Sequence, residues 1–217
     1  MKTAVIAGSS GLIGGILTKL LLEDKRYSKV ISLGRRKLDI SDPKLEQKIV
    51  DFNNLDEVDL ACDDVFCGLG TTIKQAGSQA NFRKVDFNYP ANLAERSQVC
   101  GAKRFLLVSS LGADSKSKVF YSKVKGETEA VIAQVGLETV HIFRPSILLG
   151  ARKEFRMGEL LGKAAMKGLG FMMLGRLKKY RAIQASTVAK SMLYYANQPE
   201  VGLFIHESNQ IQDSVSK

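Results

Sequence analysis

Short apolar runs rich in Val, Ile and Phe alternate along this chain with stretches whose apolar residues recur at helical spacing. We predict strands at six of these runs, over residues 3–7, 30–33, 49–52, 65–67, 105–108 and 139–143. A continuously apolar run is typical of a parallel strand buried on both faces, and right-handed helical crossovers then cover both sides of the sheet. The sequence therefore predicts an α/β fold with a doubly wound parallel sheet.

The chain length and the pattern near the C-terminus favour one domain. With 217 residues, the chain exceeds a minimal core and falls short of two comfortable domains. After Pro145 the sequence becomes rich in Gly, Met and Lys up to Gly175, and we predict a helix over residues 187–197 and a strand over 203–205. We expect a single Rossmann-type domain over residues 1–217. Residues 151–217 would form a small elaboration that covers a substrate or meets a partner at the carboxyl ends of the strands.

The composition argues against several kinds of site and location. Cys62, Cys67 and Cys100 are odd in number and lack paired CxxC spacing, and His141 and His206 are the only histidines, so we expect reduced thiols and no metal site. No apolar run approaches the roughly 18 residues needed to span a bilayer, and the amino terminus lacks a signal-peptide pattern. We therefore expect a cytoplasmic protein without a membrane span.

The formal net charge of +10 is concentrated in one segment. Residues 151–181 contain nine basic side chains and two acidic ones. A solvated basic surface is the simplest interpretation, and a surface for an anionic substrate, a protein partner or an anionic lipid face is the alternative. Nucleic-acid binding is disfavoured, because no helix-turn-helix, zinc finger or aromatic stacking platform accompanies the charge.

A glycine-rich turn follows the first predicted strand, with the pattern GxxGxxG from Gly8 through Gly11 to Gly14. Glycines at such a turn let the backbone turn sharply, approach a pyrophosphate and pack the following helix close to the sheet. The N–H groups at the start of that helix suit an anion. A tight turn without a ligand is the alternative, but the position between a strand and a helix favours a nucleotide site.

The second predicted strand ends at Arg35 and Arg36, about where an NAD-binding protein places an acid for the ribose 2′-hydroxyl. A guanidinium matches a 2′-phosphate by charge and by forked hydrogen-bond geometry. The sequence therefore predicts NADP(H) as the cofactor, preferred over NAD(H). The alternative is an ordinary exposed basic loop that continues into Lys37.

A candidate catalytic set follows the predicted strand over residues 105–108. Tyr121 and Lys125 lie four residues apart at the start of a predicted helix, so both side chains lie on one face, and the ammonium favours the phenolate. Ser109 and Ser110 end the strand at the sheet edge, where a hydroxyl can polarise a carbonyl. The alternative is a pair of loop-capping serines and an unrelated surface tyrosine.

Taken together, these motifs resemble those of the short-chain dehydrogenase/reductase superfamily. More narrowly, the chain resembles the atypical branch typified by the HIV Tat-interactive protein oxidoreductase. This resemblance extends over most of the chain and rests on five strings: GRRKL at 34–38, CGLGTT at 67–72, VSSLGAD at 108–114, YSKVKGE at 121–127 and FRPSILLG at 143–150.

The resemblance implies roles for individual residues. Ser110 takes the position of the catalytic serine with Ser109 behind it, Tyr121 that of the acid, and Lys125 that of the ribose contact. The implied cofactor contacts are Gly8, Ser9, Ser10, Gly11, Leu12, Ile13, Arg35, Arg36, Asp51, Phe52, Leu69, Gly70, Thr71, Ser109, Tyr121, Lys125, Pro145, Ser146, Ile147 and Leu148. Asn88 falls where many relatives carry a helix asparagine, although Pro90 follows closely enough to disturb the helix.

Two departures qualify the resemblance: Ala7 replaces a threonine common before the first glycine, and the C-terminal part is shorter than in extended sugar-nucleotide epimerases. We therefore expect a small substrate cover and a small carbonyl substrate. The predicted function is an NADPH-dependent oxidoreductase of the short-chain reductase type, acting as a monomer or homodimer. The alternative is an NADP(H)-binding regulatory or protein-interaction protein with little or no turnover.

Overall fold

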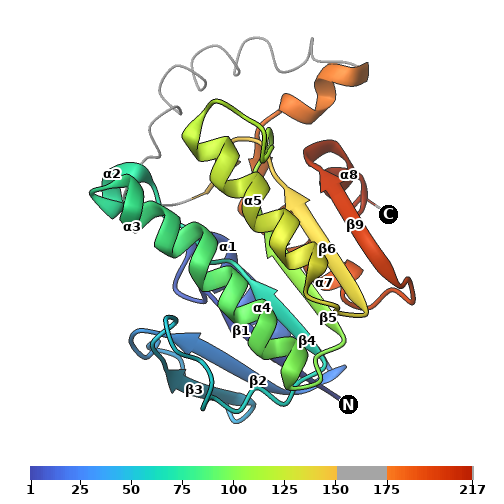
Figure 1. Ribbon diagram of the computed structural model, residues 1–217. Coiled ribbons are helices and arrows are strands. Elements are labelled where there is room, and N and C mark those ends of the chain that lie inside the picture. The colour runs from blue at the N-terminus through green and yellow to red at the C-terminus, as the bar shows by residue number, and fades with distance from the viewer. Residues whose placement is uncertain (151–174, 217) are drawn as a thin grey trace.

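A seven-stranded parallel sheet forms the centre of the computed structural model, which describes residues 1–150 and 175–216 (Figure 1). Its strand order is β3-β2-β1-β4-β5-β6-β9. The strands are β1 (Lys2–Ala7), β2 (Tyr27–Gly34), β3 (Leu45–Ile49), β4 (Asp64–Cys67), β5 (Arg104–Val108), β6 (Thr139–Arg144) and β9 (Gly202–Glu207). This order is that of a doubly wound Rossmann-type sheet, so the predicted fold class is confirmed.

Helices cover both faces of the sheet. Figure 1 shows α4 (Tyr89–Val99) and α5 (Phe120–Gln134) in front, with α1 (Leu12–Glu23) and α7 (Ala185–Tyr195) behind. The shorter elements are α2 (Ile73–Ala76), α3 (Gln79–Arg83), the π-helical turn η1 (Lys84–Asn88), the 3₁₀ helix η3 (Gly175–Tyr180) and α8 (Ser208–Asp213). A separate two-stranded pair joins β7 (Leu148–Leu149) to β8 (Ile183–Gln184).

The central strand β1 explains why the strands are continuously apolar. Ala4 and Ile6 pack into the cluster on the α1 and α7 side, whereas Val5 and Ala7 pack into the cluster on the α4 and α5 side. All four residues have no exposed surface. Successive side chains of a strand point to opposite faces, so a strand covered on both faces needs apolar residues at every position.

Five of the six strands predicted before residue 145 overlap observed strands along their whole length, but the strand predicted over residues 49–52 is wrong. The observed strand β3 runs over Leu45–Ile49, and Val50 and Phe52 lie in the loop that follows it. As an edge strand paired only with β2, β3 is partly exposed at every position, and Ile49 is 62% exposed. Strand β3 therefore lacks the apolar run that marks a central strand. The strand was predicted too late in the sequence because Val50 and Phe52, in the loop that follows β3, are apolar.

The C-terminal predictions are close to the observed elements. The helix predicted over 187–197 is α7, which begins and ends two residues earlier, and the strand predicted over 203–205 lies within β9. Most of the basic segment predicted as a surface, residues 151–174, lies outside the described residues. In its described part, Lys178 forms an ion pair with Asp213 at 2.8 Å.

No helix within residues 1–150 and 175–216 has both the length and the apolar character needed to cross a bilayer. A search of the same residues finds no group of three or more His, Cys, Asp or Glu side chains arranged to hold a metal ion.

The two histidines form a buried pair between β6 and β9. His141 Nδ1 lies 3.0 Å from His206 Nε2, and the side chains are 1% and 6% exposed. The His206 ring stacks on Tyr195 of α7 with a centroid distance of 3.9 Å. Burial lowers the pKa of each imidazole to about 4, and for His141 the neighbouring His206 and Arg104 charges act in the same direction. Both rings are therefore neutral in the folded protein at neutral pH.

We predict that the free energy of unfolding falls as pH is lowered from 7 to 5. The unfolded chain binds protons near the ordinary histidine pKa of 6.5, whereas the folded pair resists protonation until about pH 4, so stability is lost as pH falls through this interval. The expected loss is about 2 kcal/mol for each histidine, or roughly 4 kcal/mol for the pair. Urea denaturation at the two pH values measures it.

A His141→Phe/His206→Phe double variant is the control, because it removes both titrating groups and both hydrogen-bond partners together. Since the chain has two histidines in all, its stability should change little over the same interval. An equal decline in this variant would show that other groups cause the pH dependence.

Candidate functional site

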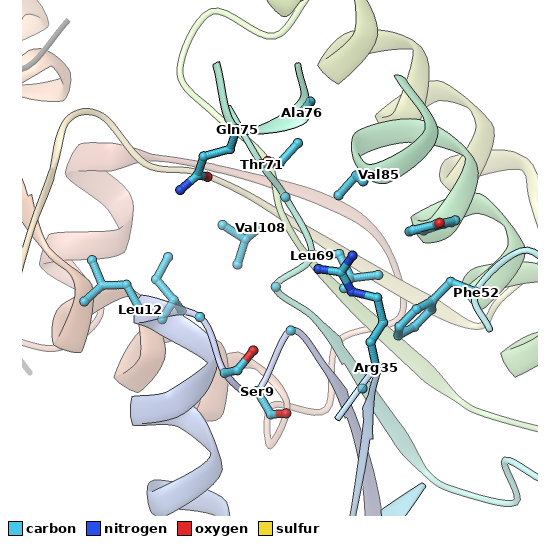
Figure 2. Close-up of a pocket in the computed structure, with 18 of the residues that line it drawn as sticks. Ser9, Leu12, Arg35, Phe52, Leu69, Thr71, Gln75, Ala76, Val85 and Val108 are labelled. Carbon is cyan, nitrogen blue, oxygen red and sulfur yellow. The ribbon is translucent and has the colours of Figure 1, made fainter. Parts of the chain in front are cut away.

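A cavity of about 990 Å³ opens at the carboxyl ends of the central strands, where the strand order reverses between β1 and β4 (Figure 2). Ligands of open α/β sheets bind at this kind of switch point. The volume lies at the upper end of the range of small-molecule sites, which suits a dinucleotide together with a small substrate. The walls come from the ends of β1, β2, β4 and β5 and from η1 and α5.

The glycine turn after β1 forms the floor of this cavity. Gly8 has a φ of +87°, and a Cβ there would lie 2.6 Å from the Gly68 carbonyl carbon. A Cβ on Gly14 would lie 2.1 Å from the Gly8 carbonyl oxygen. Both positions need glycine because backbone segments approach each other where a side chain would stand. Ser9 ties the turn to β2 through a 2.7 Å hydrogen bond between its Oγ and Ser32 Oγ.

The N-terminus of α1 is open to an anion. Gly11 is the N-cap residue and provides no side-chain acceptor, and the first turn of the helix carries no acidic residue. Gly11, Leu12 and Ile13 line the cavity. The first N–H groups of a helix lack intrahelical acceptors, and they lie at the positive end of the helix dipole. A pyrophosphate bound here would accept hydrogen bonds from these groups.

Cationic side chains dominate the charge of the cavity wall. Arg35, Arg36, Lys84 and Lys125 all line it, and no Asp or Glu is found among the described lining residues. Figure 2 shows Arg35 extending from the end of β2 alongside Phe52. Arg35 and Arg36 are both exposed at the cavity mouth. This distribution of charge favours a ligand that carries several phosphate groups.

Helix α5 brings Tyr121 and Lys125 to the same cavity, one helical turn apart. The Tyr121 ring packs on Phe82 of α3 with a centroid distance of 5.5 Å. Lys125 Nζ forms an ion pair with Asp86 Oδ1 at 2.8 Å, and both side chains are buried. Tyr121 and Lys125, which are four residues apart in sequence, therefore reach the same cavity from one face of α5.

The two strand-end serines differ in their partners. Ser109 Oγ donates to Glu129 Oε1 at 2.5 Å, and Glu129 also accepts two-pronged hydrogen bonds from Arg144. Ser110 Oγ is buried and has no hydrogen-bond partner among the described residues. A buried hydroxyl without a partner is costly unless a ligand satisfies it, so Ser110 is the serine whose hydroxyl is available.

The cavity brings together most of the predicted contacts. Those that line it are Gly8, Ser9, Ser10, Gly11, Leu12, Ile13, Arg35, Arg36, Phe52, Leu69, Gly70, Thr71, Ser109, Tyr121, Lys125 and Leu148. The predicted residues that do not line it are Asp51, Ser110, Pro145, Ser146 and Ile147.

Two of these five have partners elsewhere. Asp51 is exposed, and hydrogen bonds from the backbone and side chain of Asn53 hold the pKa of its carboxyl below the ordinary value. Ser146 Oγ donates to the carbonyl oxygen of Arg181, and Ser208 Oγ donates to Ser146 Oγ at 3.0 Å.

The structure also adds lining residues that the sequence did not suggest. They follow β4 and are Gln75, Ala76, Asn81, Lys84, Val85 and Tyr89. The rule that ligands bind beyond the carboxyl ends of strands could have drawn attention to this stretch, but no motif in it marks single residues. Asn88, the expected helix asparagine, is exposed, and Asp86 lies beside Lys125 instead.

These features fit an adenine dinucleotide phosphate. The glycine turn leaves room for a pyrophosphate at a helix N-terminus, and two guanidinium groups stand at the end of β2. The phenol of Tyr121 and the ammonium of Lys125 line the same cavity. The fold and the cavity together define an NAD(P)-binding protein of the Rossmann type.

The chain belongs to the NAD dependent epimerase/dehydratase family, which it matches over residues 4–200. Within that family it is an atypical short-chain dehydrogenase/reductase, as the resemblance of its motifs implied. It is 39% identical over 198 residues to Protein HTATIP2 of Rattus norvegicus, a match that covers 88% of this chain and 80% of the relative. It is 31% identical over 205 residues to "Protein FMP52, mitochondrial" of Debaryomyces hansenii, covering 91% and 88%.

Solved structures of nucleotide-binding proteins share the fold. The Bordetella bronchiseptica enzyme WbmH in complex with NAD+ matches with a TM-score of 0.71 at 17% identity, covering 96% of this chain and 76% of that one. The human epimerase family protein SDR39U1 with NADPH matches with a TM-score of 0.64 at 18% identity, covering 94% and 74%. At this level of identity the likeness concerns the fold.

Close packing at Gly126 sets the position of the Tyr121 and Lys125 helix against the loop after Ser110. A Cβ on Gly126 would lie 2.1 Å from the Ser115 backbone nitrogen and 2.3 Å from the Asp114 carbonyl carbon. We predict that Gly126→Ala destabilises the protein by about 1–3 kcal/mol, because the loop must move away from the helix. Urea denaturation measures the change.

Alanine is favoured over glycine inside helices by about 1 kcal/mol, so helix preference alone would make Gly126→Ala stabilising. A loss of stability in this variant therefore indicates the close approach of the loop. Ala130→Gly makes the reverse change at an exposed position of the same helix, so it is the matched control. It should destabilise the protein by about the ordinary difference in helix preference, roughly 1 kcal/mol. A Gly126→Ala variant at least as stable as the wild type would refute the close approach.

Proposed function

We propose that the protein is an NADPH-dependent oxidoreductase of the short-chain reductase type that acts on a small carbonyl compound. The observation that carries the proposal is the composition of one cavity wall. An uncapped helix N-terminus, two arginines and a phenol–ammonium pair line the same cavity, without a carboxylate among the described lining residues. Each of these groups suits a different part of one phosphorylated dinucleotide and its substrate.

Different residues of the cavity bind different parts of the cofactor. The N–H groups at the start of α1 hold the pyrophosphate, and Arg35 and Arg36 hold the 2′-phosphate by charge-assisted hydrogen bonds. Lys125 donates to the nicotinamide ribose. The α1 turn and α5 would therefore contact different parts of the cofactor.

When bound, the nicotinamide supplies the hydride that reduces the substrate carbonyl. Tyr121 donates a proton to the carbonyl oxygen as charge develops there, and the Lys125 ammonium stabilises the phenolate that remains. Ser110 does not line the cavity, so its hydroxyl, which has no partner among the described residues, must turn toward the cavity to donate a hydrogen bond to the same oxygen. In the reverse direction the same groups remove the proton from an alcohol.

Arg35→Ala/Arg36→Ala is expected to weaken NADPH binding by roughly 10- to 100-fold while NADH binding changes little. At this exposed position the two arginines together contribute about 1.5–3 kcal/mol through charge-assisted hydrogen bonds to the 2′-phosphate, and NADH lacks that phosphate. Titration of cofactor fluorescence measures both dissociation constants.

Lys37→Ala is the matched control, since Lys37 continues the basic run but does not line the cavity. It should leave the ratio of the two constants unchanged. Equal losses of NADPH and NADH affinity in the double-arginine variant would contradict the assignment of the 2′-phosphate site.

Tyr121→Phe is expected to lower turnover by at least about 100-fold, because phenylalanine keeps the ring but has no proton to donate. The NADPH dissociation constant should stay within about twofold, since the hydroxyl contributes little to ground-state binding of the cofactor. A panel of aldehydes, ketones and quinones, followed by NADPH consumption, identifies a substrate for this comparison.

Tyr194→Phe removes a hydroxyl from an exposed tyrosine of α7 outside the cavity and should leave turnover unchanged. Full activity of Tyr121→Phe would exclude the proposed chemistry. Tight NADPH binding without turnover of any carbonyl in the panel would instead support a regulatory role for the bound protein. The cytoplasmic location expected from the sequence stays a prediction, which cell fractionation can test.

A further inference from the structure

Asp86 is a buried carboxylate behind the cavity wall that the proposed chemistry does not use. Its side chain is 1% exposed, and Oδ1 lies 2.8 Å from Lys125 Nζ, whose side chain is 8% exposed. Oδ2 accepts a 2.8 Å hydrogen bond from the Thr71 N–H in the loop after β4. One carboxylate thus joins the lysine on α5 to a loop that lines the cavity.

The neighbouring backbone leaves little freedom around this contact. A Cβ on Gly70 would lie 3.3 Å from Asp86 Oδ1 and 3.8 Å from Lys125 Nζ. The absence of a side chain at residue 70 therefore lets the loop lie against the ion pair. The cavity-lining segment Leu69–Thr71 and the lysine are held by the same group.

Pro90 explains the backbone conformation at Asp86. In a regular helix the N–H of residue 90 would donate to the carbonyl oxygen of residue 86, but proline has no N–H. The helix forms the π turn η1 there, with the Tyr89 N–H donating to the Lys84 carbonyl oxygen. Thr128 Oγ1 of α5 donates to the Asp86 carbonyl oxygen at 2.8 Å in place of the missing group. Such π turns often occur at functional sites.

We infer that Asp86 is a positioning residue that holds the Lys125 ammonium, in its charged form, where it meets the nicotinamide ribose. The inference rests on the proposed function. A buried ammonium without an anionic partner would lose its proton readily and would have no fixed position. The Asp86 carboxylate is held by the Thr71 N–H and by the η1 turn. It therefore supplies the negative charge that keeps Lys125 protonated and fixes where the Lys125 ammonium lies.

The other titratable groups around the pair are few among the described residues. Tyr121 shares α5 with Lys125, the exposed Lys84 lies on η1, and the Cys67 thiol at the end of β4 has a pKa raised to about 12 by burial. Glu129, one turn further along α5, is paired with Arg144 at 2.5 Å. Asp86 is therefore the carboxylate to vary when the charge on Lys125 is tested.

Asp86→Asn keeps the shape of the side chain and one acceptor oxygen for the Thr71 N–H, but removes the negative charge. We expect NADPH binding at pH 7.5 to weaken about tenfold, the effect of losing a hydrogen bond to a charged group. Between pH 7 and 10 the affinity of the variant should begin to fall at lower pH than that of the wild type. Fluorescence titration of NADPH across this range measures both effects, and a purely structural change would not move the onset.

The Lys125→Met background separates action through the lysine from a general effect on packing. If Asp86 acts through Lys125, adding Asp86→Asn to Lys125→Met should change the NADPH dissociation constant by less than about twofold. It should also restore stability in urea, because the double variant no longer buries an unpaired charge. If Asp86→Asn alone does not fold but the Asp86→Asn/Lys125→Met double variant does, that recovery also shows that Asp86 acts through Lys125.

Glu127→Gln is the matched control, since it removes a negative charge two residues from Lys125 but from a side chain that pairs with Arg83. Its affinity and pH dependence should equal those of the wild type. Wild-type behaviour of Asp86→Asn, or an equal further loss of affinity in the Lys125→Met background, overturns the inference. If the wild-type protein itself does not bind NADPH, the proposed function fails first and the positioning role fails with it.

Discussion

The close approach of three glycines at the carboxyl ends of β1 and β4 is the constraint on which the site depends. The Gly8 position lies against Gly68, and the Gly14 position lies against the Gly8 carbonyl oxygen, at distances that leave no room for a Cβ. This contact brings the start of α1 to the place where the strand order reverses. The unpaired N–H groups of the helix then line the cavity instead of facing bulk solvent. A side chain at Gly8 or Gly14 would separate the helix from the sheet.

Charge is arranged in two layers around this turn. The cavity wall carries arginine and lysine side chains, and its described residues include no carboxylate. The carboxylates of Asp86 and Glu129 lie behind the wall, where one pairs with Lys125 and the other with Arg144 and Ser109. Each buried carboxylate gives the groups in front of it a hydrogen-bonded or ion-paired partner, which fixes their position. The same layering distinguishes the two serines, because Glu129 engages Ser109 and leaves Ser110 without a described partner.

Central strands, edge strands and helix turns differ in how clearly the sequence marks them. Central strands were predicted well because burial on both faces requires apolar residues at every position, as Ala4 to Ala7 illustrate. The edge strand β3 was misplaced because its half-exposed positions carry no such requirement. The sequence analysis expected Asn88 near the site, but the residue beside Lys125 is Asp86. Pro90 removes one helical hydrogen bond, and the π turn that results brings Asp86 to the site. Sequence spacing alone does not show which side chain a π turn directs inward.

The sequence by itself determined the alternation of strands and helices, the glycine turn, the arginines at the end of β2 and the spacing of Tyr121 and Lys125. These are local properties, because backbone conformation and the faces of one helix follow from neighbouring residues. Only the tertiary structure decided that Asp86 meets Lys125 across two helices and that Ser109, rather than Ser110, engages Glu129. Such contacts join residues 20 or more positions apart, and their geometry depends on how helices pack on the sheet, which no local pattern specifies.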